Sequence, residues 1–282
     1  MKKAISIWSF GNRPVESSIL LAARAGFEGI ELALDEKGEV GMESSASELT
    51  RIRDFARDTG VMIHSLATGL YWSYSLTSND MDERKKAYRI ALKQLETADV
   101  LGAGSVLIVP GAVGVDFAPS MGIVDYDIAY ERSLEALSGL KDRAGELGIS
   151  IGIENVWNKF LLSPLEFRDF IDKIGSPFVG AYLDVGNVVY DGYPEQWIKI
   201  LGKRIKKVHF KDYRRGSAGL SGFVDLLSGD VDWPKVMEAF RQTGYDSWVT
   251  AEMLPPYTHH PDQIIFNTAA SMSRILGGSE ND

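Results

Sequence analysis

Four apolar runs in the second half of the chain each end on a side chain that can bind a metal or move a proton. The runs end at Glu154, Asp184, His209 and Glu252. Carboxylate oxygens and imidazole nitrogens are ligands for Mn²⁺, Mg²⁺, Co²⁺ and Zn²⁺, and four such residues leave positions open for the neighbouring oxygens of a substrate. These four residues are therefore candidate ligands of one divalent metal.

Buried charge favours the metal interpretation over a purely structural one. A single acidic residue at the end of a strand is commonly a helix N-cap or a surface charge. Three carboxylates and a histidine buried together carry a large desolvation cost unless a cation compensates them. The chain has no cysteine, which excludes thiolate-bound zinc, iron–sulfur clusters and disulfides. We therefore predict one metal ion held by histidine and carboxylates alone.

These side chains need a scaffold that brings strand ends together, and the sequence alternates short apolar runs with longer helical patterns. Such alternation is typical of parallel strands covered by crossover helices. Eight βα units without a linker or low-complexity stretch predict an α/β fold, a (β/α)₈ TIM barrel, as a single domain spanning 1–282. A doubly wound open sheet is the alternative. The predicted strands cover 4–9, 29–34, 61–66, 105–109, 150–154, 179–184, 205–211 and 247–252.

Reactive side chains of a β/α barrel lie where the strands end, because the carboxyl ends open into the loops that form the pocket. Glu154, Asp184, His209 and Glu252 lie at or near the ends of the last four predicted strands. Since these strands are consecutive around the barrel, we expect the four side chains to converge. No Gly-x-Gly-x-x-Gly segment follows the first strand, and no Walker-type Gly-Lys-Ser/Thr loop occurs, so nucleotide binding is not expected.

Composition restricts the partners. The formal net charge is -9 and the sequence pI is about 5.1, so the protein repels nucleic-acid phosphates and anionic lipids. The apolar stretch 4–8 is too short for a signal-peptide core, and the apolar segment 105–115 is too short to span a bilayer. We expect a cytoplasmic homo-oligomer, a dimer or tetramer, that acts on a small molecule and has no nucleic-acid or membrane partner.

Four motifs make the chain resemble a known family. They are Ile-Glu-Asn at 153–155, Leu-Asp-Val-Gly-Asn at 183–187, His-Phe-Lys-Asp at 209–212 and Gly-Asp-Val-Asp-Trp at 229–233. With these motifs, nearly the whole chain resembles the xylose isomerase-like superfamily of sugar isomerases and epimerases. The resemblance is strongest to the branch of tagatose 3-epimerase and the hexulose- or pentulose-phosphate epimerases.

This resemblance implies a mechanism. In the family, the residues that match Glu154, Asp184, His209 and Glu252 bind one metal, and the two glutamates are the acid/base residues on opposite faces of the sugar. The implied reaction is 3-epimerisation of a ketose or ketose phosphate through a cis-enediolate, with Mn²⁺ the first choice of metal and Co²⁺, Mg²⁺ or Zn²⁺ as alternatives.

Other reactions use a similar site. An aldose–ketose isomerase shares the enediolate, and an inosose dehydratase-like lyase would expel water from a keto-sugar. A non-catalytic sugar-binding barrel is a further alternative. The apurinic endonuclease relatives of this fold need several metals and a basic DNA groove, which the net charge of -9 opposes.

Substrate contacts are predicted at five further residues. Arg215 matches a family position that contacts the substrate, and Asn187 stands where several ketose 3-epimerases carry a substrate-binding histidine. His64, near the end of the third strand, could bond a sugar hydroxyl. Trp8 and Trp157 could form apolar walls on which a sugar stacks.

Lys211 lies two residues after the candidate ligand His209. A lysine at this position could neutralise a substrate phosphate or pair with the adjacent Asp212. We predict the ion pair.

Overall fold

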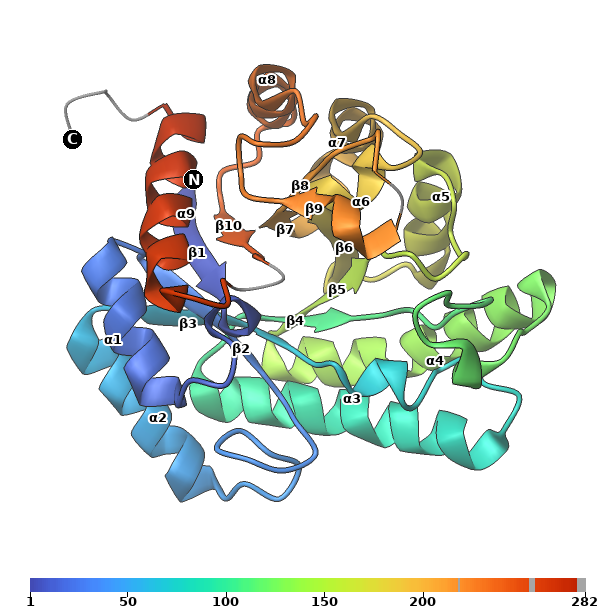
Figure 1. Ribbon diagram of the computed structural model, residues 1–282. Coiled ribbons are helices and arrows are strands. Elements are labelled where there is room, and N and C mark those ends of the chain that lie inside the picture. The colour runs from blue at the N-terminus through green and yellow to red at the C-terminus, as the bar shows by residue number, and fades with distance from the viewer. Residues whose placement is uncertain (218, 254–256, 278–282) are drawn as a thin grey trace.

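Eight parallel strands form a closed barrel in the computed structural model, which describes residues 1–217, 219–253 and 257–277 (Figure 1). The strands follow one another around the barrel in the order β1-β10-β7-β6-β5-β4-β3-β2. The first strand pairs with both the second and the last, which closes the sheet. The predicted (β/α)₈ barrel is confirmed, and the doubly wound open sheet is excluded.

The barrel strands alternate with helices along the chain. In the described residues the elements are β1 (Lys2–Ser6), α1 (Val15–Ala25), β2 (Gly29–Ala33), α2 (Ala46–Thr59), β3 (Met62–Ala67), α3 (Met81–Leu101), β4 (Ser105–Ile108), α4 (Tyr126–Leu147), β5 (Ser150–Glu154), α5 (Pro164–Ile174), β6 (Val179–Asp184), α6 (Val185–Val189), α7 (Pro194–Leu201), β7 (Ile205–Phe210), β8 (Asp212–Tyr213), β9 (Phe223–Val224), α8 (Trp233–Thr243), β10 (Trp248–Ala251) and α9 (Pro261–Ile275).

The helices form because each presents one apolar stripe to the barrel. In α3 the stripe includes Ala87, Ile90 and Leu95, all buried against the strands. Local signals fix where helices begin: in α5 the Ser163 side chain accepts from the Glu166 backbone N–H, and Pro164 occupies the first turn. The last described helix, α9, packs on β1 and α1, so the first and last described elements lie on the same side of the barrel (Figure 1).

Two strand ends differ from the prediction in ways that affect the site. β1 ends at Ser6, and Trp8 lies in the 3₁₀ turn Ile7–Phe10, which follows the strand directly. β10 ends at Ala251, so Glu252 is the first residue beyond the strand. Both residues remain at the carboxyl end of the barrel.

An antiparallel hairpin, β8 paired with β9, follows the seventh barrel strand and was not predicted. Its strands are two residues long, too short to produce a recognisable alternation. The Asp212 carboxylate organises this region by accepting from the backbone N–H groups of Tyr213, Leu227 and Val231 and from the indole of Trp233. The motif at 209–212 therefore ends in a residue that shapes the loop.

In the part of the chain that the structure describes, no helix is both long and apolar enough to cross a membrane.

Candidate metal centre

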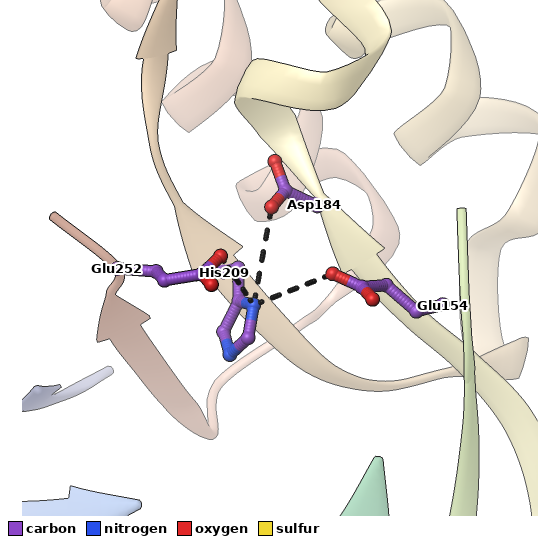
Figure 2. Close-up of side chains that lie close together, drawn as sticks. All are labelled: Glu154, Asp184, His209 and Glu252. Atoms are coloured by element: carbon purple, nitrogen blue, oxygen red, sulfur yellow. Dashed lines mark ion pairs between the residues drawn. The ribbon is translucent and has the colours of Figure 1, made fainter. Parts of the chain in front are cut away.

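The four predicted ligands converge at the carboxyl end of the barrel. Glu154 ends β5, Asp184 ends β6, His209 lies one residue before the end of β7, and Glu252 follows β10. One ligand atom from each residue lies within 4.8 Å of the others. Figure 2 shows the three carboxylates directed at the His209 ring. Its Nδ1 lies 3.4 Å from Glu252 Oε2, 3.7 Å from Glu154 Oε1 and 3.9 Å from Asp184 Oδ2.

The donor set fits a divalent cation. All four side chains are buried. His209 Nδ1 makes no hydrogen bond of normal geometry to the described residues, and, beyond the His209 ring, Asp184 Oδ2 and Glu252 Oε2 have only their ion pairs with Lys211. Buried polar atoms are almost always satisfied, and a single ammonium does not balance three carboxylates, so the unbonded imidazole nitrogen among them indicates a ligand. Three carboxylate oxygens and one imidazole nitrogen suit a hard or borderline divalent metal.

Lys211 enters the cluster from the end of β7. Its Nζ lies 2.6 Å from Glu252 Oε2 and 3.1 Å from Asp184 Oδ2. Gly186 allows this approach, because a Cβ at that position would lie 2.7 Å from the Lys211 Cβ. The predicted pair between Lys211 and Asp212 is therefore wrong: Asp212 is occupied by backbone N–H groups, and the ammonium lies between two candidate metal ligands.

Glu31 on β2 orients the histidine and was missed by sequence reasoning. Its Oε1 lies 2.9 Å from His209 Nε2, and its Oε2 accepts from the Tyr182 hydroxyl. A carboxylate only accepts, so Nε2 donates to Glu31 and Nδ1 is left facing the three carboxylates. Gly152 leaves room for this arrangement, since a Cβ there would lie 2.8 Å from Tyr182 Cδ2. The signal available in the sequence was Glu31 itself, an acidic residue in an otherwise apolar strand. A charge buried in such a strand rarely lacks a partner.

The two glutamates of the cluster differ in proton affinity. Burial raises the pKa of Glu154 to about 7, and the adjacent His209 partly opposes that rise. Burial also acts to raise the pKa of Glu252, but Lys211 and His209 outweigh it and hold that pKa far below its usual range. The His209 pKa is raised well above its usual range, because Glu31, Glu154 and Glu252 outweigh the effect of burial. Positive charge from His209 and Lys211 is thus placed among the carboxylates.

Two asparagines hold the strand ends in place. Asn155 accepts from the Asp184 backbone N–H at 2.8 Å and donates to the Asp184 carbonyl at 2.9 Å. Asn187 donates through its backbone to Asp184 Oδ1 at 2.8 Å and through its side chain to the Asn155 carbonyl at 3.0 Å. The motifs at 153–155 and 183–187 therefore link β5 to β6 and fix the Asp184 carboxylate.

A cavity of about 580 Å³ opens above the cluster, a size typical of small-molecule sites. Most of its wall is apolar. The lining residues are Trp8, Thr68, Trp72, Leu107, Val109, Phe117, Glu154, Val156, Trp157, Asn187, Lys211, Leu220, Ser221, Phe223 and Glu252. The predicted contacts Trp8, Trp157 and Asn187 are among them.

Arg215 and His64 lie outside this lining. The Arg215 guanidinium donates to the carbonyls of Val189 at 2.6 Å and Gly192 at 2.8 Å, which ties it to the end of α6 and the loop that follows. His64 is buried in the barrel, with Nε2 3.1 Å from Thr250 Oγ1 and its ring stacked on Trp248. In the structure both side chains support the scaffold around the cavity.

A closed (β/α)₈ barrel with three carboxylates and one histidine at four consecutive strand ends defines a class of barrel with a candidate metal centre in its mouth. Comparison with known sequences narrows that class. Residues 19–273 match the family described as xylose isomerase-like TIM barrel. The chain belongs to this family.

The sequence identity to individual relatives is low. The chain is 24% identical to a putative L-ribulose-5-phosphate 3-epimerase of Escherichia coli K12, over 83% of this chain and 82% of the relative. It is also 24% identical to an inosose dehydratase of Lacticaseibacillus casei, over 67% of this chain and 69% of the relative. Among solved structures, a D-psicose 3-epimerase crystallised in the presence of D-fructose superposes with a TM-score of 0.81 at 22% identity, covering 99% of this chain and all of the other. The last similarity shows the shared fold.

Proposed function

We propose that Glu154, Asp184, His209 and Glu252 hold one divalent metal, Mn²⁺ in the first instance, and that the protein is a metal-dependent sugar epimerase. The proposed reaction is inversion at C3 of a ketose or ketose phosphate. The observation that carries the proposal is the position of the two glutamates, which belong to the candidate metal cluster and also line the cavity.

The reaction requires removal and return of a carbon-bound proton. When bound, the metal would supply Lewis-acid polarisation of the substrate carbonyl and its neighbouring hydroxyl. Glu154 and Glu252 extend from β5 and β10, with β6 and β7 between them, so they approach the cavity from different strands. One glutamate takes the proton next to the carbonyl, which gives a cis-enediolate, and the other returns a proton to the opposite face.

The walls of the cavity would orient the sugar. We propose that Trp8 and Trp157 contact the apolar face of the ring and that Asn187 contacts a hydroxyl, because all three line the cavity. For Arg215 and His64 we propose indirect roles, since their polar atoms bond to the loop after α6 and to Thr250.

Solvent exchange tests this function. The enzyme, stripped of metal and then loaded with Mn²⁺, Co²⁺ or Mg²⁺, is incubated in D₂O with a panel of ketoses, ketose phosphates and keto-glycosides. We expect deuterium at the carbon next to the carbonyl, inverted product, and loss of both in Glu154→Gln and Glu252→Gln. Glu146→Gln, an exposed carboxylate on α4, is the matched control. Full turnover in both active-site variants would refute the two-glutamate mechanism.

A lyase is the second candidate, favoured by the similarity to an inosose dehydratase. Elimination of water begins with the same proton removal but ends with loss of a hydroxyl instead of return of a proton. Mass spectrometry distinguishes the outcomes, because only the lyase product is lighter by one water. An aldose–ketose isomerase would produce an aldose of unchanged mass.

A further inference from the structure

The cavity above the metal centre continues into a second, outer cavity of about 440 Å³. Phe117, Val156, Trp157 and Leu220 line both. The two spaces therefore form one cleft with an inner lobe over the catalytic glutamates and an outer lobe between the loops after β4, β5, β6 and β8. A bare ketose placed over the glutamates would leave the outer lobe unused.

Apolar and aromatic side chains form most of the wall of the outer lobe, and the charged residues that line it are Asp116, Lys159 and Asp191. Leu162, Tyr190 and Leu220 line it with 58%, 56% and 52% of their surface exposed, and Phe117 is 42% exposed. Exposed apolar groups gathered in one concave site indicate a ligand. Trp157 connects the lobes: its ring stacks on Phe223 in the inner lobe and lies 5.3 Å from the Tyr190 ring in the outer lobe.

The charges of the cleft disfavour a phosphate. Of the residues that line either lobe, the basic ones are Lys211 and Lys159. Lys211 is paired with Glu252 and Asp184, and Lys159 lies 2.8 Å from Asp116. Glu154 and Glu252 add negative charge to the inner lobe. Residues 218 and 254–256, which lie outside the described ranges, include no basic residue in the sequence. A dianionic phosphate would therefore find no unpaired basic side chain among the lining residues described.

We propose that the outer lobe is a substrate subsite for an apolar, ring-shaped substituent. The substrate is then an unphosphorylated glycoside whose keto group is at a ring carbon other than the anomeric one, since a ketose linked through its anomeric carbon has no free carbonyl. The carbon inverted is the one next to that keto group, in place of C3 of a free ketose. The sugar lies over the glutamates, and the substituent packs between Trp157, Tyr190, Leu162 and Leu220. This inference rests on the proposed function for the sugar half of the cleft, while the outer subsite rests on its own walls.

Binding of unreactive glycosides tests the subsite separately from the chemistry. Phenyl and methyl glucosides, as both anomers, contain no carbonyl, so their affinity does not depend on proton removal. With the Mn²⁺-loaded enzyme we expect one phenyl anomer to bind at least about tenfold more tightly than its methyl counterpart, since burial of the ring stabilises the complex by more than about 1.4 kcal/mol. Calorimetry measures both constants. Equal affinities would overturn the proposal.

Variants locate the effect. Leu162→Ser and Tyr190→Ala should each reduce the phenyl-to-methyl ratio, because these side chains line the outer lobe and not the inner one. Leu20→Ser, which removes a similarly exposed leucine from α1, should leave the ratio unchanged. An unchanged ratio in both outer-lobe variants would overturn the proposal. Dissociation of a dimer in Leu162→Ser with an unchanged ratio would also overturn it, because the apolar surface would then serve contact between subunits.

Substrate panels separate this inference from the proposed function. Ketose phosphates should bind no more tightly than the free ketoses, and a phosphate-dependent gain of tenfold or more would contradict the inference while leaving epimerisation intact. A high phenyl-to-methyl ratio without deuterium exchange on any keto-sugar would support the subsite and refute the proposed function.

Discussion

Replacement of Glu31 by Gln should weaken metal binding although Glu31 is not itself a candidate ligand. Glu31 receives two contacts, from His209 Nε2 at 2.9 Å and from the Tyr182 hydroxyl. A glutamine has one acceptor oxygen, so it can serve one of these donors while its NH₂ group faces the other. If Tyr182 keeps the oxygen, His209 is pushed toward the tautomer that carries its proton on Nδ1, which faces the carboxylates.

The magnitude follows from the contact that is lost. Changes to the group that orients a metal-binding histidine typically cost about 10- to 100-fold in metal affinity, or about 1.4 to 2.7 kcal/mol. Calorimetric titration of the chelator-treated protein with Mn²⁺ measures this directly. Tyr182→Phe is the control: it leaves the carboxylate bonded to His209 and should weaken Mn²⁺ binding less than Glu31→Gln.

A folded Glu31→Gln protein with unchanged Mn²⁺ affinity would refute the reasoning. Circular dichroism and the melting temperature show whether the variant is folded. Equal losses in Glu31→Gln and Tyr182→Phe would show that packing of the barrel interior, and not orientation of the imidazole, produces the effect.

Three further predictions concern the surrounding charges. Lys211→Met should lower the unfolding free energy of the chelator-treated protein by about 3 to 5 kcal/mol, measured by chemical unfolding. The loss should be smaller in the Mn²⁺-loaded protein, because the metal then compensates the same carboxylates. Equal losses with and without metal would contradict this. Burial, with Lys207 and His209, lowers the pKa of His64 well below its usual range. Only the unfolded chain then takes up this proton, so unfolding free energies should fall by up to about 1.4 kcal/mol per pH unit below about pH 6.5, and His64→Gln should reduce that slope. Glu252→Gln should lower the exchange rate by about 10²- to 10⁴-fold while inactive sugars still bind, and undiminished exchange would exclude Glu252 from proton transfer.

The fold could be predicted because its signals are local and repeated. The strands at 150–154 and 179–184 were predicted with their observed bounds, since parallel strands buried on both faces form short continuous apolar runs. Gly26, Gly60 and Gly102 follow α1, α2 and α3 as left-handed C-caps, the position at which glycine is the commonest residue. The predicted ends of strands next to loops were less accurate, because no periodicity marks where pairing stops. Trp8, for example, was placed in the first strand and lies in the turn after it.

The cluster was predictable because the barrel topology fixes where strand ends meet. Glu154, Asp184, His209 and Glu252 required no knowledge of side-chain packing. Glu31 and Lys211 could not be placed in the site without such knowledge. Glu31 contacts His209, which is 178 residues away in the sequence, and Lys211 pairs with carboxylates at two other strand ends. The same holds for the outer lobe of the cleft, whose walls come from four separate loops.

The most direct test of the metal centre is a titration of the chelator-treated protein with Mn²⁺ in D₂O, with a responsive keto-sugar present. Bound metal is followed by electron paramagnetic resonance and deuterium incorporation by NMR in the same samples. We predict that exchange is absent without metal, rises in proportion to bound Mn²⁺ and saturates at one ion per chain, and that His209→Ala neither binds the ion tightly nor exchanges. Full exchange in the presence of chelator, or in His209→Ala, would contradict a metal centre built from these four residues.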